Sequence, residues 1–259
     1  MKIVALSDTH GDLLSVKKLP EGDVLCIPGD IVPLEIQSNK AASIAWFCME
    51  FLPWVEKLPY KYVILVGGNH DFFLYYIGPY IGRDADYVLD SLIPKTQRKR
   101  FKKLRYLCDS GCTIEINGKR VKFWGTPWCA ELDRWAFYLP NKAGSNPYWE
   151  GNGEVSVYEN LEHKFSQIPS DIDIIITHMP PKVGTAGQVL EKYRFNTGSD
   201  YGSPELRDAL ARCNYKYLLC GHVHSGCHEP IDFNGGKVVN VSLKGEDYKQ
   251  RYEPFVFEV

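Results

Sequence analysis

The sequence predicts an α/β fold in which two β-sheets pack face to face as a sandwich flanked by helices. Three observations lead to this prediction: five short apolar runs bounded by turn residues, helical patterns between several of them, and one segment of strict alternation. The composition agrees, because 44% hydrophobic and 24% charged residues are enough for a full core. A length of 259 residues suits a single domain covering residues 1–259.

The five apolar runs predict β-strands that are buried on both faces. Each run is short, rich in apolar residues and followed by Gly, His, Asp or Asn, which are typical turn residues. The runs span residues 3–6, 24–27, 62–66, 172–176 and 217–220.

Helical patterns lie between several of these runs. Apolar residues recur at helical spacing over residues 44–55, although Pro53 is expected to end or kink that helix. Further along, Ser203 is a predicted N-cap and Pro204 occupies the first helical position.

Residues 112–123 predict an antiparallel hairpin. Apolar residues alternate with polar ones on both sides of Asn117-Gly118, and this dipeptide is the strongest short-range hairpin signal. The hairpin adds an antiparallel element to an otherwise parallel pattern, which a two-sheet sandwich covered by helices accommodates.

Potential metal ligands follow all five predicted strands. Ligands bind just outside the carboxyl ends of strands in open α/β sheets, and side chains two apart on an extended segment project to the same side. Each motif alone is weak, since Gly-Asp is common turn chemistry and a single His is more often a core residue. Their coincidence at five equivalent positions predicts one metal site. Its ligands are Asp8, His10, Asp30, Asn69, His178, His222 and His224.

In this order the motifs resemble the calcineurin-like metallophosphoesterase superfamily over nearly the whole chain. The family pattern is Asp-x-His, Gly-Asp, Gly-Asn-His-Asp/Glu, a single His and Gly-His-x-His, and all five blocks are present. Further blocks at residues 7–10, 125–128 and 177–181 resemble the small class III phosphodiesterases and the metallophosphoesterase-domain-containing group. The resemblance implies a four-layer α/β/β/α metallophosphoesterase fold.

The same resemblance implies how two divalent metal ions share the ligands. One ion would be held by Asp8, His10, Asp30 and His224. The other would be held by Asp30, Asn69, His178 and His222, so that Asp30 bridges. This mixed nitrogen and oxygen set suits Mn, Fe, Zn, Co or Ni better than Ca, without selecting one of them.

His70 is implied by the resemblance to be the catalytic general acid, which protonates the leaving alkoxide; the alternative is a packing histidine. The surplus positive charge of the cluster suits a phosphoryl group, so we expect direct attack by a metal-bound hydroxide without a covalent intermediate. Three positions after the bridging Asp, protein phosphatases have an acidic residue followed by Arg, and purple acid phosphatases have a ligating Tyr. Pro33 and Leu34 exclude both classes and leave the partner that orients His70 unidentified.

The expected activity is hydrolysis of phosphodiester bonds in a small substrate, with cyclic nucleotides as one candidate. A phosphomonoesterase or nuclease is the nearest alternative, and a non-catalytic metal-binding scaffold is another, which the complete ligand set disfavours. Trp128 opens an aromatic-rich stretch up to residue 149 and is a candidate for stacking on a nucleobase; the alternative is packing beneath a long loop. Residues 179–203 are expected to form the rim of the site.

Charge and hydropathy exclude several partners. The net charge of -2 gives no general attraction to nucleic acid or anionic membranes, and no apolar run approaches a membrane span. Seven basic residues within 95–105 predict a solvated helix face; lining the cleft is the alternative, and nucleic acid is not favoured. The eight cysteines form no C-x-x-C pair, so we expect reduced thiols in a cytoplasmic protein, with no protein partner implied.

Overall fold

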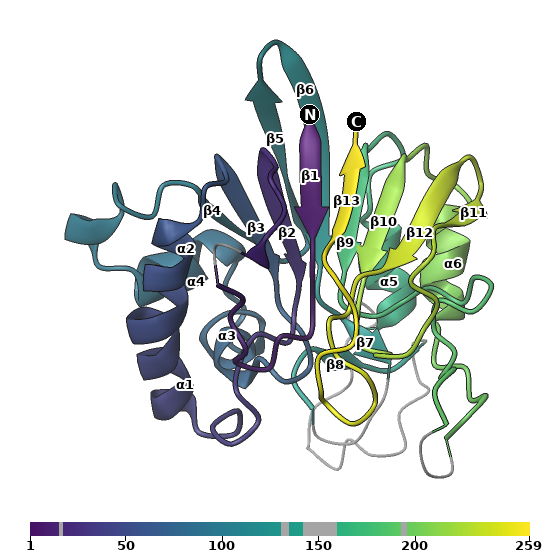
Figure 1. Ribbon diagram of the computed structural model, residues 1–259, viewed down its shortest axis with the longest axis horizontal. Coiled ribbons are helices and arrows are strands. Elements are labelled where there is room, and N and C mark those ends of the chain that lie inside the picture. Colours follow the sequence, from purple (N-terminus) through teal and green to yellow (C-terminus); the bar gives the residue numbers. More distant parts are fainter. Residues whose placement is uncertain (16–17, 131–134, 142–159, 193–195) are drawn as a thin grey trace.

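Two large β-sheets pack against each other in the structure, a computed structural model, and helices cover their outer faces (Figure 1). The fold class predicted from the sequence is therefore confirmed. The structure describes residues 1–15, 18–130, 135–141, 160–192 and 196–259.

The first sheet has five strands in the order β13-β1-β2-β3-β4. The three pairings from β1 to β4 are parallel, and β13 is antiparallel to β1 at the edge. Three of the predicted strands, with small shifts at their ends, are β1, β2 and β3. The bounds are β1 (Lys2–Ala5), β2 (Val24–Pro28), β3 (Tyr62–Val66), β4 (Leu104–Leu107) and β13 (Phe255–Glu258).

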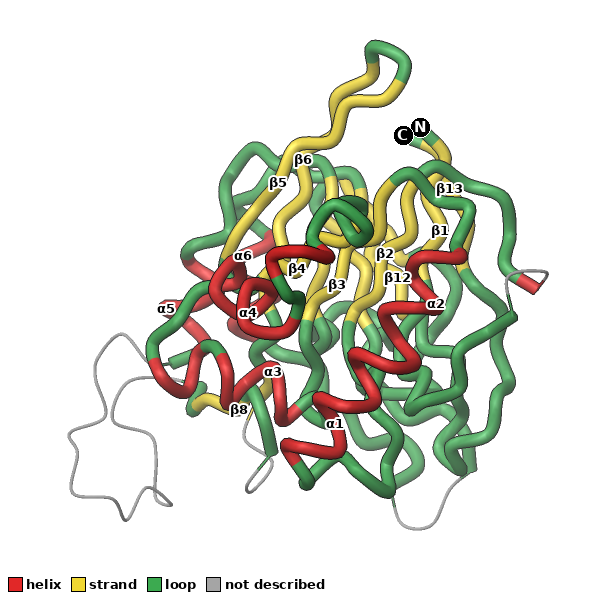
Figure 2. Tube along the Cα trace, turned by 90° about the vertical axis from the view of Figure 1, so that its left-hand side faces the viewer, coloured by secondary structure: helices red, strands yellow, loops and turns green. Residues whose placement is uncertain are grey.

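The second sheet has six strands in the order β11-β12-β10-β9-β6-β5, and its four central strands are parallel. The bounds are β5 (Ser110–Ile116), β6 (Lys119–Thr126), β9 (Ile174–Thr177), β10 (Tyr217–Cys220), β11 (Ile231–Phe233) and β12 (Gly236–Asn240). The hairpin predicted at Asn117-Gly118 is confirmed as β5 and β6, which extend beyond the body of the molecule (Figure 2). A small third sheet pairs β7 (Cys129–Ala130) with β8 (Tyr138–Leu139).

Side-chain alternation along the strands divides the core into two layers. In β1, Ile3 and Ala5 pack between the sheets, whereas Val4 belongs to the cluster that includes the helices. In β9, Ile174 and Ile176 likewise pack between the sheets, whereas Ile175 belongs to the cluster that includes the helices. Because successive strand side chains point to opposite faces, each strand supports both layers and must be apolar throughout.

Short helices cover the outer face of each sheet. The first sheet is covered by α1 (Lys40–Trp46), α2 (Leu52–Lys57), α3 (Phe72–Ile77) and α4 (Ala85–Leu92), with 3-10 turns η3 (Pro79–Ile81) and η4 (Lys95–Gln97). The second sheet is covered by α5 (Leu161–Ser166) and α6 (Pro204–Leu210). As predicted, Ser203 caps α6: its Oγ accepts a hydrogen bond from the N–H of Leu206 at 3.1 Å. No helix in the described ranges has the length and apolar character to cross a membrane.

The helix does not end at Pro53, but its α-helical geometry is interrupted just before it. A π-helical segment, η2 (Phe47–Phe51), joins α1 to α2, and the N–H of Leu52 reaches back to the carbonyl of Phe47. Pro53 therefore lies in the first turn of α2, the part of a helix that best tolerates proline. The helical course continues to Lys57 (Figure 2).

The basic residues at 95–105 lie on the surface beside α2 rather than along one helix face. Arg100 forms an ion pair with Glu56, and the Lys103 Nζ donates to the carbonyl of Leu58 at 2.6 Å. Both contacts bind this segment to the end of α2, away from the strand ends that carry the predicted ligands.

Candidate metal centre

The predicted ligands converge at one edge of the sandwich. The strands β1 and β2 end at the lower edge in Figure 1, and the ends of β3, β9 and β10 meet them there. Hydrogen bonds between distant segments connect these ends, such as the bond from the His178 Nδ1 to the carbonyl of Pro28 at 2.7 Å.

Asp8, His10 and His224 form one group of ligand atoms at this edge. The Nε2 atoms of His10 and His224 are 3.3 Å apart, and the Nε2 of His224 lies 3.5 Å from Asp8 Oδ1. The Nδ1 of His224 donates to the carbonyl of Gly245 at 2.9 Å, which leaves its Nε2 directed toward the group. A backbone partner of this kind fixes the tautomer of a metal-binding histidine.

Asn69, His178 and His222 form a second group. The Oδ1 of Asn69 is 2.9 Å from His178 Nε2 and 2.8 Å from His222 Nδ1. Because the Nδ1 of His178 donates to the backbone, its Nε2 is the nitrogen that faces this group.

Asp30 lies between the two groups. Its Oδ2 is 3.2 Å from His178 Nε2 and 3.8 Å from His70 Nε2. Its Oδ1 accepts the backbone N–H of His70 at 2.8 Å, which fixes the orientation of the carboxylate. Asp30 also shares one potential metal-binding group with His10 and His70, and another with Asp8 and His178.

The electrostatics of these residues fit bound cations. Asp8 and Asp30 are 0% and 1% exposed, and no Lys or Arg in the described part of the chain pairs with either carboxylate. Burial raises their pKa values, but the facing histidines, His224 for Asp8 and His178 for Asp30, outweigh it and lower both pKa values. Two buried carboxylates beside inward-facing imidazole nitrogens form a donor set that divalent cations neutralise.

The histidines themselves have opposite pKa shifts. Burial lowers the pKa of His10 to about 3, and burial together with the charge of His178 lowers the pKa of His222 to about 3. Burial also disfavours the charged form of His178, but the carboxylate of Asp30 raises its pKa to about 9. When no cation is bound, protonated His178 therefore neutralises part of the negative charge of Asp30.

Unusual backbone conformations direct four of the predicted ligands. Asp8, His10, Asp30 and His222 have φ angles of 55°, 44°, 55° and 68°, in the left-handed region that non-glycine residues rarely adopt. The adjacent Gly221 also permits a close approach, because a Cβ there would lie 2.2 Å from Asp8 Oδ2. The backbone N–H of His222 consequently reaches Asp8 Oδ1 at 3.2 Å.

Asp71 connects the loops that carry Asp30 and Asn69. Its side chain is fully buried and accepts four backbone N–H bonds, from Asp30 at 2.8 Å, Ile31 at 3.0 Å, Val32 at 3.2 Å and Gly68 at 2.9 Å. Burial and the nearby charge of Asp30 raise the pKa of Asp71 to about 7. This residue holds ligand loops in place without facing the metal-binding groups.

His70 has a partner that the sequence did not reveal. Its Nδ1 contacts the Oε1 of Gln37, a residue of the turn between β2 and α1, so Nδ1 donates and Nε2 faces Asp30. The position of the acidic residue in protein phosphatases is occupied by Pro33, which packs against Gly11 instead. Burial lowers the pKa of His70.

A cavity of about 380 Å³ opens above these groups. Its lining combines ligands with side chains from loops: Asp30, Asn69, His70, Trp135, Val189, Asn196, Tyr201, His222, Val223, His224, Glu246 and Tyr248. The ring centroids of Trp135 and His70 are 4.5 Å apart, and that of Tyr248 is 5.0 Å from those of His10 and His224. Two aromatic rings therefore border the space in front of His70.

A family model described as calcineurin-like phosphoesterase matches residues 1–226. The chain belongs to that family. Its members are metal-dependent phosphoric ester hydrolases, and the carboxylate and histidine groups described above could bind such metals.

Individual relatives agree with the family. A UPF0046 protein of Caenorhabditis elegans is 27% identical over 273 residues, covering 100% of this chain and 60% of its own length. The human metallophosphoesterase domain-containing protein 1 is 27% identical over 268 residues, covering 100% of this chain and 71% of its own length. The structure of phosphopantetheinyl hydrolase from Mycobacterium tuberculosis has the same fold, with a TM-score of 0.54 at 14% identity; 95% of this chain and 90% of that chain are covered.

Trp128 of this calcineurin-like phosphoesterase is not among the residues that line the cavity. It is 4% exposed, packs on Phe137, and donates from Nε1 to Asp109 at 2.8 Å. This position does not support the expected stacking role and agrees with packing beneath a loop, because the side chain is enclosed by the core and by Lys164. Two other aromatic residues of that stretch, Tyr148 and Trp149, lie outside the described residues.

The loop expected to form the rim does contribute to the cavity. From residues 179–203, Val189, Asn196 and Tyr201 line it, while residues 193–195 lie outside the described ranges. Tyr248 and Gln37 were not identified from the sequence, because neither belongs to a local motif and both reach the site through distant contacts.

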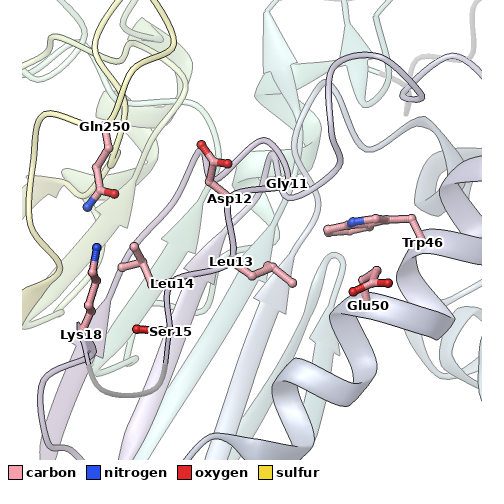
Figure 3. A pocket seen from close by; sticks show the side chains of 9 residues that line it. All are labelled: Gly11, Asp12, Leu13, Leu14, Ser15, Lys18, Trp46, Glu50 and Gln250. Carbon is pink, nitrogen blue, oxygen red and sulfur yellow. The ribbon is translucent and has the colours of Figure 1, made fainter.

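A second hollow, of about 480 Å³, lies beside residues 11–15, which directly follow the predicted ligand His10 (Figure 3). Trp46 and Glu50 of the helical run border one side, and Lys18 and Gln250 border the other. None of the predicted ligands lines this hollow, and its charged side chains have mixed signs. The smaller cavity above the ligand groups is therefore the candidate site.

Proposed function

We propose that this chain hydrolyses phosphodiester bonds of small substrates at a dinuclear metal centre formed by the converging strand ends. The observation that carries the proposal is the buried cluster of two carboxylates and facing imidazoles beneath an open cavity. A cluster of this composition needs cations, and the cavity gives a substrate access to them.

The proposed ligand assignment follows the two groups of atoms. One cation would be held by Asp8, His10, Asp30 and His224. The other would be held by Asp30, Asn69, His178 and His222. When bound, the cations supply Lewis-acid activation of water and of the phosphoryl oxygens.

His70 is proposed to be the general acid. Its Nε2 faces Asp30 at 3.8 Å, its ring lines the cavity, and Gln37 holds Nδ1 in the donating tautomer. Because Nδ1 keeps the proton that it donates to Gln37, His70 acts as the acid when Nε2 is protonated as well. The Nε2 proton then passes to the leaving oxygen of the substrate, and the neutral tautomer with a proton on Nδ1 remains. Pro33 leaves no acidic side chain at the usual position, so a neutral amide orients this histidine.

The charge of the cavity favours a diester over a monoester. No Lys or Arg is among its described lining residues, and Glu246 adds a carboxylate. A phosphate monoester carries close to two negative charges at neutral pH, whereas a diester carries one. Because the described lining residues include no Lys or Arg to balance a second negative charge, the singly charged diester fits better.

The aromatic border favours a substrate with a planar group, such as a nucleotide. Trp135 and Tyr248 both line the cavity, and their ring centroids lie 4.5 Å from that of His70 and 5.0 Å from that of His10. Stacking on an aromatic side chain contributes about 1–3 kcal/mol per base, which is enough to select nucleotides among small diesters.

Hydrolysis of bis(p-nitrophenyl) phosphate and of p-nitrophenyl phosphate tests the proposal. Metal-stripped protein would be resupplied with Mn, and wild type compared with Asp30→Asn, His70→Ala and, as a matched control on α5, His163→Ala. We expect diester turnover that requires metal, collapses in Asp30→Asn and persists in His163→Ala. His70→Ala should lower it less than Asp30→Asn does, because p-nitrophenolate leaves without much help from an acid. Arg134, which precedes Trp135 but lies outside the described residues, should be changed to Ala in the same assay to test the charge argument.

Other outcomes point elsewhere. Faster turnover of the monoester would replace the diesterase proposal by a phosphomonoesterase, and cleavage of single-stranded DNA would favour a nuclease. Protein that retains two ions yet hydrolyses neither ester nor DNA would contradict catalysis and support a metal-binding scaffold.

A further inference from the structure

Cys129 lies beside the second group of ligands and has no role in the proposed chemistry. Its Sγ is within 4.8 Å of a ring nitrogen of His178 and of His222, and these two nitrogens are also within 4.8 Å of each other. The residue is only 2% exposed, so its thiol is directed into the protein and not toward solvent.

The local fold fixes Cys129 at a strand end equivalent to those of the other ligands. It follows β6, which pairs in parallel with β9 in the register Thr126 to Thr177, one residue before His178. Its backbone N–H donates to the carbonyl of Phe137 at 2.8 Å, which holds β7 against β8. The Sγ otherwise contacts only the carbonyl of Pro127 at 3.6 Å among the described residues, a weak bond.

The geometry allows one cation to reach all three ligand atoms. Three atoms no more than 4.8 Å apart always have a common point within about 2.8 Å of each, and small side-chain shifts shorten this to Zn–S and Zn–N distances of about 2.3 and 2.0 Å. The Nε2 of His178, which makes no bond to the backbone, also lies 2.9 Å from Asn69 Oδ1.

We propose that Cys129 is an additional ligand of the second cation and makes that position selective for a thiophilic metal such as Zn or Fe over Mn. This inference rests on the proposed dinuclear centre. On binding, the S–H bond breaks, a sulfur–metal bond forms and the proton passes to the buffer, with no change of oxidation state. Thiolate ligands favour Zn and Fe, whereas Mn prefers oxygen donors.

Cobalt substitution tests this proposal without relying on activity. The metal-stripped full chain would be titrated with Co(II) alone and followed by absorption spectroscopy. Visible ligand-field bands report that cobalt is bound, and a near-ultraviolet sulfur-to-cobalt charge-transfer band reports a thiolate ligand. We expect both in wild type, and only the visible bands in Cys129→Ser.

A matched control is Cys213→Ser, which removes a buried thiol at the end of α6 that contacts the carbonyl of Ala209. This variant should keep the charge-transfer band. In competition measurements, Cys129→Ser should weaken Zn binding at one of the two positions by at least about 10-fold and change Mn binding far less.

The outcomes separate this inference from the function on which it rests. Visible bands without a charge-transfer band in wild type would refute the thiolate ligand and leave the dinuclear centre intact. Absence of any cobalt spectrum would overturn both. If Cys129→Ser folds poorly, Cys129→Ala provides a second test. This variant should also lose the charge-transfer band and the preference for Zn over Mn.

Discussion

The floor and the rim of the cavity are built in different ways. The floor consists of side chains at strand ends that are buried, with exposed fractions of 0% for His178 and 8% for His10, except for His222, which is partly exposed. The rim comes from loops, and its tyrosines Tyr201 and Tyr248 are 36% and 39% exposed. Floor histidines are held by hydrogen bonds to backbone carbonyls, as His178 is by Pro28 of β2, whereas the ring of Tyr248 at the rim packs against the rings of His10 and His224.

This difference indicates that the floor and the rim have separate roles. A floor fixed by the sheets can position cations and a general acid within the small tolerance that catalysis requires. A rim made of loops can differ in shape without disturbing the floor, so it determines which substrate fits. Substitutions in the floor should therefore affect rate and stability, and substitutions in the rim should affect substrate affinity.

The largest effect is expected for Asp30→Asn. Loss of the carboxylate between the two groups removes a charge from the floor, so kcat should fall on the order of 10³-fold or more, as when preorganised electrostatic groups are lost. Metal content measured on the purified variant should fall with it. An Asp30→Asn protein that keeps two ions and more than a tenth of the activity would show that this carboxylate is not the link between them.

Asp71→Ala should produce the next largest effect, on stability. The substitution leaves four buried backbone N–H groups without an acceptor, which should lower the free energy of unfolding by about 3–5 kcal/mol. Denaturant unfolding of metal-free protein measures this cost. Asp71→Asn keeps one acceptor oxygen and should lose less, so equal losses in the two variants would contradict the role of the hydrogen bonds.

Metal removal should lower stability to a smaller extent. An ion at 100 times its dissociation constant adds about 2.7 kcal/mol to the stability of the folded state, or about 5–10 °C in Tm for a chain of this size. Chelation of wild type followed by thermal unfolding gives the shift. The rim variant Trp135→Ala should show the same shift and Asp30→Asn a smaller one; the reverse order would break the distinction between floor and rim.

Gln37→Ala should weaken catalysis in a way that depends on the leaving group. Without the contact at Nδ1, His70 loses its fixed tautomer and orientation, so kcat should fall about 10–100-fold for a phenyl diester. The p-nitrophenyl diester should be affected much less, because its leaving group needs little protonation. Equal losses for both esters would indicate a purely structural role, and Gln37→Glu should recover much of the phenyl ester activity.

The smallest effect is expected at the rim. Trp135→Ala should raise KM for a nucleotide diester about 5–50-fold through loss of stacking, with kcat nearly unchanged. For a methyl diester that lacks an aromatic group, KM should not change. Trp128→Phe, a change in the core outside the cavity, serves as the control and should leave KM for both substrates unaltered.

The floor could be predicted from the sequence because its signals are local. Each ligand follows an apolar run that is recognisable as a strand, and parallel strands place their carboxyl ends together, so the positions of Asp8 and His178 follow from pattern alone. The two-sheet fold and the hairpin at Asn117-Gly118 were predictable for the same reason. The course of the helix through Pro53 was not, because a π-helical segment has no simple sequence pattern.

The remaining parts of the site depend on contacts between distant segments. Gln37 is 33 residues from His70, and nothing near Gln37 in the sequence marks it as a partner. Tyr248 reaches His10 from the far end of the chain. Trp128 differs from these two residues, because the sequence did mark it. Its place after a strand suggested contact with substrate, whereas the structure places it in the core beside Asp109 and Lys164.

The left-handed backbone at Asp8, His10, Asp30 and His222 has an evolutionary consequence. Each of these residues adopts a conformation that costs a non-glycine residue about 1–2 kcal/mol and that glycine adopts freely. Mutations to glycine at these positions would relieve strain, so selection for thermal resistance alone would tend to remove the ligands one by one. A glycine at any of the four would also remove a side chain of the proposed metal centre, so the strain is stored where the proposed chemistry takes place.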